Sequence, residues 1–423
     1  MASVAEASSH SPGGGYIVSD AARLKRQLRS AERRGKLKAL GLVAPLFLFI
    51  VVSFIIPIVI LLKNAVYDPD IADNMPATVA ALQNWDGKEI PDEAIFAALA
   101  ADLKAAHENR KAPLIGKRLN YDIGGIRSKI ISSARKAAAL TAPPYKEQMI
   151  AADRIWDDRT TWASIKKAGQ KITPFYILKS VDLERDPDGS IVKVPANQAI
   201  YIDILIRTIG ISLLVTVLTL ILGFPVAYVL ANLPPRTANL LMILVLLPFW
   251  TSLLVRTTAW FVLLQDNGPV NNLLMATGVT DEPFRLIFSR FGTIVAMTHI
   301  QLPFTLLPIY SVMKGISPSY LRAARSLGGG PIYSFLRVYL PLTLPGIGAG
   351  CLLTFILCLG YYITPALVGG PTDQMVSGFI ASAMNQEGNW GKACALGAVL
   401  LVATMILFFV YNRLVGIDKV KLG

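Results

Sequence analysis

Charged side chains are scarce in this sequence. Asp, Glu, Lys and Arg make up 16% of its 423 residues, and the mean hydropathy is +0.50, whereas about a quarter of the residues in a soluble domain are charged. This deficit argues against a soluble cytosolic enzyme. The apolar composition, without the corresponding repeats, also excludes collagen, a coiled coil and a disordered chain.

Cysteine and histidine are equally rare. The three cysteines lie in apolar stretches without CxxC spacing and the three histidines are scattered, so no disulfide framework or metal site is predicted. No GxxxxGK[ST] motif is present, and the apolar runs hold no paired aspartates, GxSxG or HExxH motif. We therefore predict no catalytic, metal-binding or cofactor-binding residue and no ATP hydrolysis by this chain.

Long apolar runs are what the sequence has instead. Crossing a bilayer takes about 20 mainly apolar residues, and the charge-free runs of that order are Leu40–Leu62, Thr208–Pro235, Thr237–Val255 (continuing past Arg256 to about Leu264), Phe291–Met313, Val338–Thr372 and Ala393–Asn412. The fifth run is too long for one upright span, so its first part is predicted to be a loop or an interfacial segment. The fold class is therefore an all-α polytopic membrane protein with six transmembrane helices.

The distribution of charge predicts an orientation. The net charge is +13, yet residues 66–200 hold 19 basic and 18 acidic residues, so the excess lies beside the apolar runs. A nucleic-acid-binding protein would present a basic face with groove-reading residues, and none is evident. Residues 23–38 hold eight basic residues and one acid, which places the N-terminus, and after six spans the C-terminus, in the cytoplasm by the positive-inside rule.

The segment between the first two spans is then extracytoplasmic. It is predicted to be a small, mainly helical insert. Its expected elements are amphipathic helices over Pro91–Arg110 and Ile123–Leu140, a third helix over Tyr145–Lys167, and a hairpin in which Phe175–Glu184 and Ser190–Val194 flank a turn at residues 186–189. The insert either docks an extracytoplasmic partner or is a decoration, and the sequence does not separate these two interpretations.

The inner loop between the fourth and fifth spans, Ser317–Ile347, has the clearest local signals. A Ser N-cap followed by Pro predicts a short helix over Ser319–Leu327. Three glycines from Gly328 end it, and a proline starts a second short helix over Ile332–Tyr339. Pro341 and Pro345 are expected to break the chain before the next span. The predicted result is a helix–turn–helix unit at the cytoplasmic surface.

This loop resembles the EAA loop of the inner-membrane permeases of ABC importers. Their pattern is Glu-Ala-Ala, three residues, Gly, nine residues and Ile-x-Leu-Pro, and the chain has Arg322-Ala323-Ala324, Gly328 and Val338-Tyr339-Leu340-Pro341 at that spacing. It departs from the pattern at Arg322, where the family usually has Glu. Three further segments resemble permease subunits of spermidine/putrescine importers, so that the similarity covers about residues 40–64 and 201–415: Pro248–Trp260, Leu302–Ser317 and Gly360–Pro371.

The resemblance implies a type I permease fold in the bacterial inner membrane and a cargo of polyamines or related small organic solutes. It implies a second permease subunit, expected to form a heterodimer, two cytoplasmic ATPases that bind ATP-Mg, and an extracytoplasmic solute-binding protein. The residues implied in ATPase coupling are Arg322, Ala323, Ala324, Gly328, Leu340 and Pro341. Because Arg322 cannot pair as a Glu would, we hypothesise that the ATPase carries a compensating acid or that the second permease keeps the ordinary Glu.

Candidate residues for the translocation pathway come from polar and aromatic positions in or beside the apolar runs, namely Trp250, Arg256, Trp260, Asp266, Gln301, Tyr361 and Tyr362. Arg256 is either a pathway residue or a structural arginine near the end of the third span. Asp266 could attract a cation or be a solvated loop residue. The aromatic residues could bind an ammonium group or belong to the core and the interfacial belt, and Gln301 could bond to another helix.

The predicted organisation has four parts: a basic cytoplasmic segment (1–38), the first span (39–63), the extracytoplasmic insert (64–200) and the permease core (201–423) with its coupling loop (317–347). The alternative function is an autonomous secondary transporter of small organic cations. Such folds show inverted repeats and acids at midmembrane, and neither is evident in this sequence.

Overall fold

The computed structural model describes residues 35–36, 38–186 and 190–415. Most of the predicted N-terminal basic segment and the tip of the predicted hairpin lie outside the described residues. The first span runs from Lys38 to Asn64 and contains a π-turn, Val51–Ile55, followed by α2, Ile56–Asn64. The remainder of the described chain forms a helical bundle and the insert.

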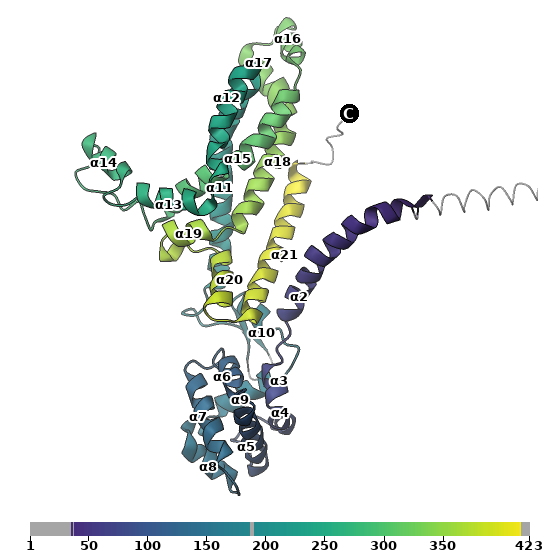
Figure 1. Cartoon of the computed structure of the whole chain (residues 1–423), viewed down its shortest axis with the longest axis vertical. Helices are drawn as coiled ribbons and strands as arrows, with labels where there is room; N and C mark the ends of the chain where they lie inside the picture. The colour runs from purple at the N-terminus through teal and green to yellow at the C-terminus, as the bar shows by residue number, and fades with distance from the viewer. Residues whose placement is uncertain (1–34, 37, 187–189, 416–423) are drawn as a thin grey trace, which may run out of the picture. The chain divides into compact units, whose positions relative to one another are not determined.

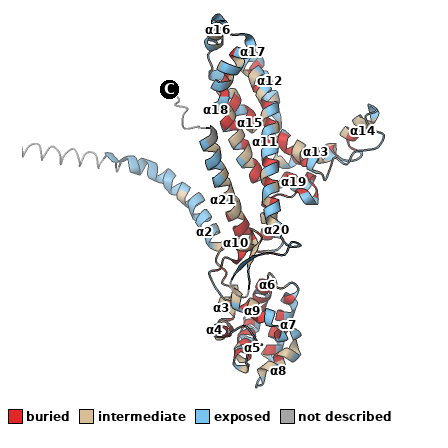
Figure 2. Ribbon diagram, turned by 180° about the vertical axis from the view of Figure 1, so that it is seen from behind, coloured by how far each residue is buried: buried red, intermediate tan, exposed pale blue. Residues whose placement is uncertain are grey.

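Five described helices are long and apolar enough to cross a membrane, and a bent pair makes the number up to six. This agrees with the predicted count. Many residues of α11, α12 and α21 are exposed (Figure 2). They include large apolar residues, as expected of helices that face lipid. The bundle comprises α11 (Tyr201–Asn232), α12 (Pro235–Leu246), η3 (Leu247–Trp250), α13 (Leu253–Leu263), α14 (Pro269–Ala276), α15 (Arg290–Gly315), α16 (Pro318–Ser326), α17 (Pro331–Ser334), η4 (Phe335–Tyr339), α18 (Leu340–Leu359), α19 (Ile363–Val368), η5 (Pro371–Asp373), α20 (Val376–Asn385) and α21 (Trp390–Val415).

The third span is not the straight helix that the apolar run predicted. Its two parts, Pro235–Trp250 and Leu253–Leu263, are bent by 92°. Pro248 sits in the short 3₁₀ turn η3, Thr251 is extended, and the Ser252 hydroxyl accepts a bond from the Val255 amide at 3.2 Å to start α13. A proline followed by a new N-cap therefore divides a run whose composition alone looks continuous.

The fifth span also differs from the prediction. It is one helical segment from Pro331 to Leu359, so Pro341 and Pro345 do not break the chain, and the surplus of the apolar run lies after the helix rather than before it. The π-turn η4 comes immediately before Pro341, where the Leu340 amide bonds to the Phe335 carbonyl five residues back. A π-turn holds one more residue than an α-helical turn. We attribute the continuity of the helix to this added residue, because it moves away the backbone carbonyl groups that the ring of Pro341 would otherwise meet.

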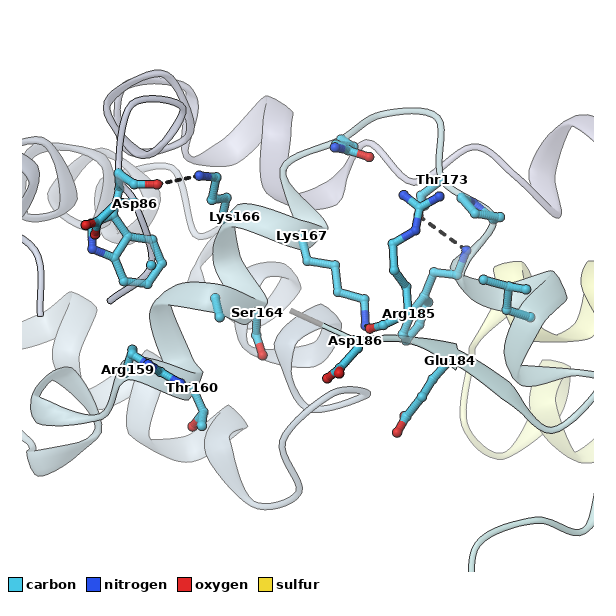
Figure 3. A pocket seen from close by; sticks show the side chains of 17 residues that line it. Asp86, Arg159, Thr160, Ser164, Lys166, Lys167, Thr173, Glu184, Arg185 and Asp186 are labelled. Atoms are coloured by element: carbon cyan, nitrogen blue, oxygen red, sulfur yellow. Dashed lines mark hydrogen bonds between the residues drawn. The ribbon is translucent and has the colours of Figure 1, made fainter. Parts of the chain in front are cut away.

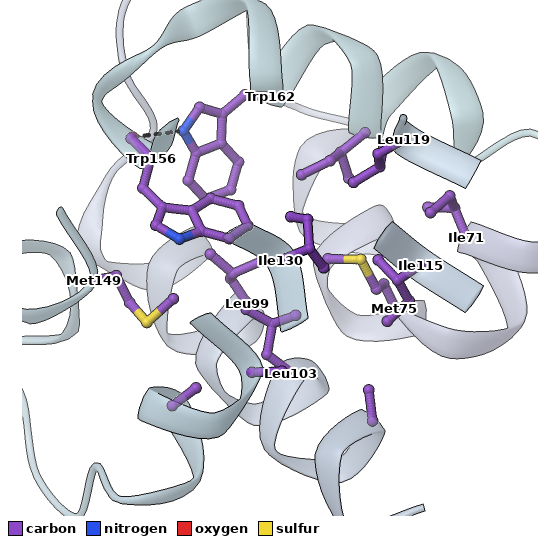
Figure 4. Close-up of a cluster of buried hydrophobic side chains, with 14 of the residues drawn as sticks. Ile71, Met75, Leu99, Leu103, Ile115, Leu119, Ile130, Met149, Trp156 and Trp162 are labelled. Atoms are coloured by element: carbon purple, nitrogen blue, oxygen red, sulfur yellow. Dashed lines mark hydrogen bonds between the residues drawn. The ribbon is translucent and has the colours of Figure 1, made fainter. Parts of the chain in front are cut away.

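The insert is a helical unit with its own core. Trp156 and Trp162 lie side by side at the centre of that core (Figure 4). Their ring centroids are 5.5 Å apart; the Trp156 indole donates to the Ser133 hydroxyl, and the Trp162 indole donates to the Trp156 carbonyl. Its elements are α3 (Asp70–Asn74), α4 (Pro76–Leu82), α5 (Glu93–Glu108), α6 (Ala112–Leu119), α7 (Ile126–Ala138), α8 (Tyr145–Ala152), η2 (Arg154–Asp157), α9 (Arg159–Ala168), α10 (Phe175–Lys179), β1 (Leu183–Arg185) and β2 (Ile191–Lys193).

Helices α5 and α7 agree with the first two helices predicted for the insert. The third, over Tyr145–Lys167, is wrong as a single helix, because Asp153 and Asp158 each cap the start of a new element, η2 and α9. Strands β1 and β2 form the predicted antiparallel hairpin, pairing Leu183 with Lys193 and Arg185 with Ile191. The first part of the predicted strand Phe175–Glu184 is helix α10 instead.

Candidate functional site

The coupling loop forms a compact hairpin of α16 and α17 (Figure 1). The Ser317 hydroxyl caps α16 by accepting a bond from the Ser319 amide at 3.4 Å, as the sequence predicts. At the other end the Gly328 amide bonds to the Arg325 carbonyl and the Gly329 amide to the Ala324 carbonyl, both at 3.0 Å. These are the two bonds of a Schellman motif. They require the left-handed φ of +87° that Gly328 has.

Apolar packing fixes this hairpin to the bundle. Leu321 and Phe335 pack into a cluster with buried Tyr339, and Tyr228 of α11 meets the rings of Phe335 and Tyr339 at centroid distances of 5.6 Å and 5.4 Å. The hairpin is thus held as a body against α11 and the start of α18. Its geometry is suited to transmitting a displacement into those helices.

The outer face of the hairpin remains available to a partner. Arg322, Ala323 and Gly328 are exposed, and Leu327 and Ile332 are 89% and 76% exposed. A groove of about 460 Å³ adjoins this face and is lined by residues that include Leu321, Arg325 and Ile332. Large exposed apolar side chains between arginines are typical of a protein-binding surface. Of the remaining predicted coupling residues, Ala324 and Leu340 are half-buried and Pro341 is exposed.

Some of the pathway candidates lie together near α13. The Trp260 indole donates to His299 Nδ1 at 3.1 Å, and the charge of Arg256 acts on both His299 and Tyr361. Arg256 lies in the first turn of α13, next to the bend that divides the third span. Its Nε is buried without a hydrogen-bond partner in the described chain.

The other candidates are dispersed. Trp250 is 86% exposed at the bend, and Tyr362 is 43% exposed. Asp266 is exposed in the link between α13 and α14. Gln301 is buried and contacts the Cys358 sulfur at 3.6 Å, joining α15 to α18 as helix–helix bonding predicts.

Sequence reasoning missed a hydroxyl cluster inside the bundle. Thr305 of α15 donates to Thr219 of α11 at 2.8 Å and is 2.6 Å from the Thr354 hydroxyl of α18. All three side chains are buried, so the cluster holds the three most closely associated spans together. The only available signal was threonine in apolar runs, which does not identify a partner.

The insert has a groove of about 430 Å³ between α9 and the hairpin (Figure 3). Lys166 Nζ donates to the Trp85 carbonyl at 2.6 Å and Lys167 Nζ to the Arg185 carbonyl at 3.0 Å. The remaining lining mixes both signs of charge, with Asp86, Glu184 and Asp186 beside Arg159 and Arg185. This mixture selects no single class of charged ligand.

A buried ion cluster, also missed, lies in the insert where α6 meets α10. Arg118 is fully buried, bonds to Asp68 and to Asp122 (2.6 Å), and stacks on Phe175 at 4.4 Å. Burial alone would lower the pKa of Arg118, but Asp122 and Asp68 raise it above its ordinary value. Burial raises the pKa of Asp68 despite the neighbouring guanidinium, and it raises the pKa of nearby Tyr121 to about 12.

Comparison with known proteins gives a family match over residues 194–417, to the model described as "Binding-protein-dependent transport system inner membrane component". The spermidine/putrescine transport system permease protein PotB of Escherichia coli is 33% identical over 214 residues, covering 51% of this chain and 78% of the relative. PotB of Haemophilus influenzae is 35% identical over 216 residues, covering 51% and 75%. The inner membrane ABC transporter permease protein YdcU of E. coli is 31% identical over 277 residues, covering 61% and 87%.

Proposed function

Because the chain belongs to the family of binding-protein-dependent transport system inner membrane components, we propose that it imports a polyamine or a related small organic solute, together with a second permease and a cytoplasmic ATPase. The family establishes the coarser facts. The chain is a multi-pass inner-membrane permease subunit of an ABC importer that depends on a solute-binding protein, and it is not an enzyme.

The α16–α17 hairpin is the observation that carries the mechanism. Its base is packed on α11 and α18, and its face is exposed, apolar and basic. Docking of an ATPase on this face is the proposed coupling step, in which ATP-driven closure moves the hairpin and, with it, the spans. The ATP and its magnesium ion belong to the ATPase. Arg322 then faces an acid on that ATPase, or the second permease, a homologue of this chain, supplies the ordinary Glu.

The cargo is proposed from two PotB relatives that are named for spermidine and putrescine. Arg256, Trp260 and Tyr361 are retained as pathway residues because Trp260 bonds to His299 and the charge of Arg256 acts on both His299 and Tyr361. Trp250, Asp266 and Tyr362 are exposed, and Gln301 bonds to the Cys358 sulfur instead, so these four are weaker candidates. The proposed orientation places the hairpin and both termini in the cytoplasm and the insert outside.

Affinity purification of the tagged chain from its native membranes, followed by mass spectrometry and uptake of radiolabelled spermidine in proteoliposomes, tests the proposal. We expect co-purification of an ATPase, a second permease and a binding protein, with uptake that needs ATP. An assembled complex that takes up no polyamine would overturn the cargo alone. Uptake by the isolated chain without ATP, driven by a proton gradient, would support a secondary transporter instead.

A further inference from the structure

The insert is joined to the two bundle helices that start beside it. Contacts to the first turn of α11 and the start of α21 come from Asp182, Tyr176 and Lys117 of the insert. We call this set of contacts the joint. Neither the coupling hairpin nor the pathway candidates take part in it.

Asp182 caps α11 from a distance of eighteen to twenty residues in sequence. Its carboxylate accepts bonds from the amides of Ile200 and Tyr201 at 3.0 Å each and of Ile202 at 2.7 Å. Ile200, the N-cap residue, makes no side-chain cap itself. One side chain of the insert therefore satisfies most of the amides that a helix start leaves unpaired, and its charge suits that end of the helix dipole.

The backbone of Asp182 is itself fixed by the insert. Its φ is +55°, a left-handed value that few non-glycine residues adopt. The Asp182 amide donates to the Lys179 carbonyl at 3.2 Å, and its carbonyl accepts from the Val194 amide at 3.1 Å, so α10 and the end of the hairpin determine the position of the carboxylate. Such over-determined backbone conformations are found where a precise position matters.

Tyr176 lies directly on the backbone of α21. A Cβ atom built on Gly391 would stand 2.4 to 2.7 Å from three atoms of the Tyr176 ring. The same face of α21 continues with small residues, Cys394, Ala395 and Ala398, which pack on Phe175 and Tyr176. Small residues let the insert approach the helix closely, and glycine is required at the nearest point.

The third contact connects the joint to the buried ion cluster of the insert. Lys117 Nζ donates to the Gly388 carbonyl at 2.7 Å, just before α21. The next residue, Arg118, is the buried cation that binds Asp68 and Asp122, and its guanidinium also lies 5.7 Å from the centroid of the Tyr176 ring. The joint is therefore continuous with the packed interior of the insert.

We propose that Asp182 and Gly391 are positioning residues that fix the insert to the starts of α11 and α21. The insert and these two helix ends then form one cooperative unit, and a load applied to the insert reaches both spans. This follows from the contacts of the joint and does not depend on the identity of the cargo.

Hydrogen exchange of the full-length chain in lipid nanodiscs, followed by mass spectrometry, tests the proposal. Asp182→Gly, which removes the carboxylate but readily adopts the φ of +55°, should speed exchange of the Ile200–Ile202 amides about fivefold or more, the effect of losing a helix cap. In Gly391→Ala, the added methyl group meets the Tyr176 ring. If the joint acts as a unit, displacing Tyr176 should also speed exchange at the Ile200–Ile202 amides. Gly397→Ala is the matched control in the same helix, since its Cβ meets only the Leu61 side chain at an ordinary 3.5 Å.

A second substitution distinguishes a positioning role from general destabilisation of the fold. Tyr176→Leu in the Gly391→Ala background gives the methyl group room and should return exchange at Ile200–Ile202 towards the wild-type rate, whereas simple destabilisation would be made worse. The proposal is overturned if Gly391→Ala alters exchange only in α10 and α21, if Asp182→Gly leaves Ile200–Ile202 protected, or if the double variant exchanges faster than Gly391→Ala.

Discussion

Gly328 is the residue at which the coupling hairpin depends most on a single backbone angle. A Cβ at Gly328 would meet no atom within 4 Å, so Gly328→Ala introduces no clash. The alanine must nevertheless hold a φ of +87°, which costs about 1–2 kcal/mol for a residue with a Cβ. We expect uptake to fall several-fold in whole cells while the amount of protein in the membrane is unchanged.

Gly330, two residues further along the chain, provides the control for this prediction. Gly330 also has open space around it, but its φ is −62°, which alanine adopts readily. Gly330→Ala should therefore transport at the wild-type rate. Equal uptake by the two variants would show that the turn conformation at Gly328 is not needed for coupling.

Arg118 illustrates a residue whose removal should be costly although the ion pair itself adds little net stability. Arg118→Met leaves the Asp68 carboxylate buried without a cation, which typically costs about 3–5 kcal/mol. Limited proteolysis of the full chain should show the insert opening. Arg135→Met, on an exposed arginine of α7, should leave the digestion pattern unchanged.

The Arg118→Met variant should also respond to pH in a defined direction. Burial already raises the pKa of Asp68 above its ordinary value of 3.8, and loss of the guanidinium raises it further. A carboxyl whose pKa is higher in the folded state binds more protons there, so stability falls as pH rises through that pKa and returns as pH falls. Protease resistance that does not improve on acidification would contradict the assignment of Asp68 as the uncompensated charge.

At the scale of the element, local signals predicted α16 more accurately than composition predicted the spans. Ser317, Pro318 and Gly328 act on their own neighbours, so their patterns identified the cap, the helix and the turn. Proline donates no amide hydrogen bond, and whether the helix bends there or continues depends on the geometry of the neighbouring turn. The helix bends at the 3₁₀ turn holding Pro248 and continues at the π-turn before Pro341. The contacts between α13 and α15, the Arg118–Asp68 pair and the contacts of Asp182 with α11 join residues that are not local in sequence and have no local signal.

The exposed face of α16 provides a prediction about its partner. If the ATPase carries an acid opposite Arg322, Arg322→Glu places like charges together, and such a juxtaposition costs several kcal/mol at an interface. We expect binding of the ATPase to the purified permease complex to weaken by at least about tenfold. Arg322→Gln, which removes the attraction without adding repulsion, should have a smaller effect. Wild-type binding by Arg322→Glu would favour the alternative, in which the second permease supplies the family glutamate.

For the whole molecule, the positions of the coupling hairpin and the insert along α11 limit the possible functions more than any single residue does. The described part of the chain contains no group of His, Cys, Asp or Glu side chains able to hold a metal ion. Its exposed coupling hairpin and its insert are attached to opposite ends of α11, the hairpin beside Tyr228 and the insert beside Ile200–Ile202. A span such as α11 crosses the bilayer once, so the two attachments belong on opposite sides of the membrane.

This separation makes the orientation testable. Lys129→Cys on α7 of the insert and Leu327→Cys at the tip of the hairpin, both exposed positions, can be treated with a membrane-impermeant maleimide. Native Cys358 and Cys394 are buried and Cys351 is partly buried within α18, so the unmodified chain is the background control. We expect labelling of the insert position in intact spheroplasts and of the hairpin position only after permeabilisation. The opposite pattern would put the hairpin outside, away from any cytoplasmic ATPase, and labelling of both positions in intact cells would contradict a single crossing by α11.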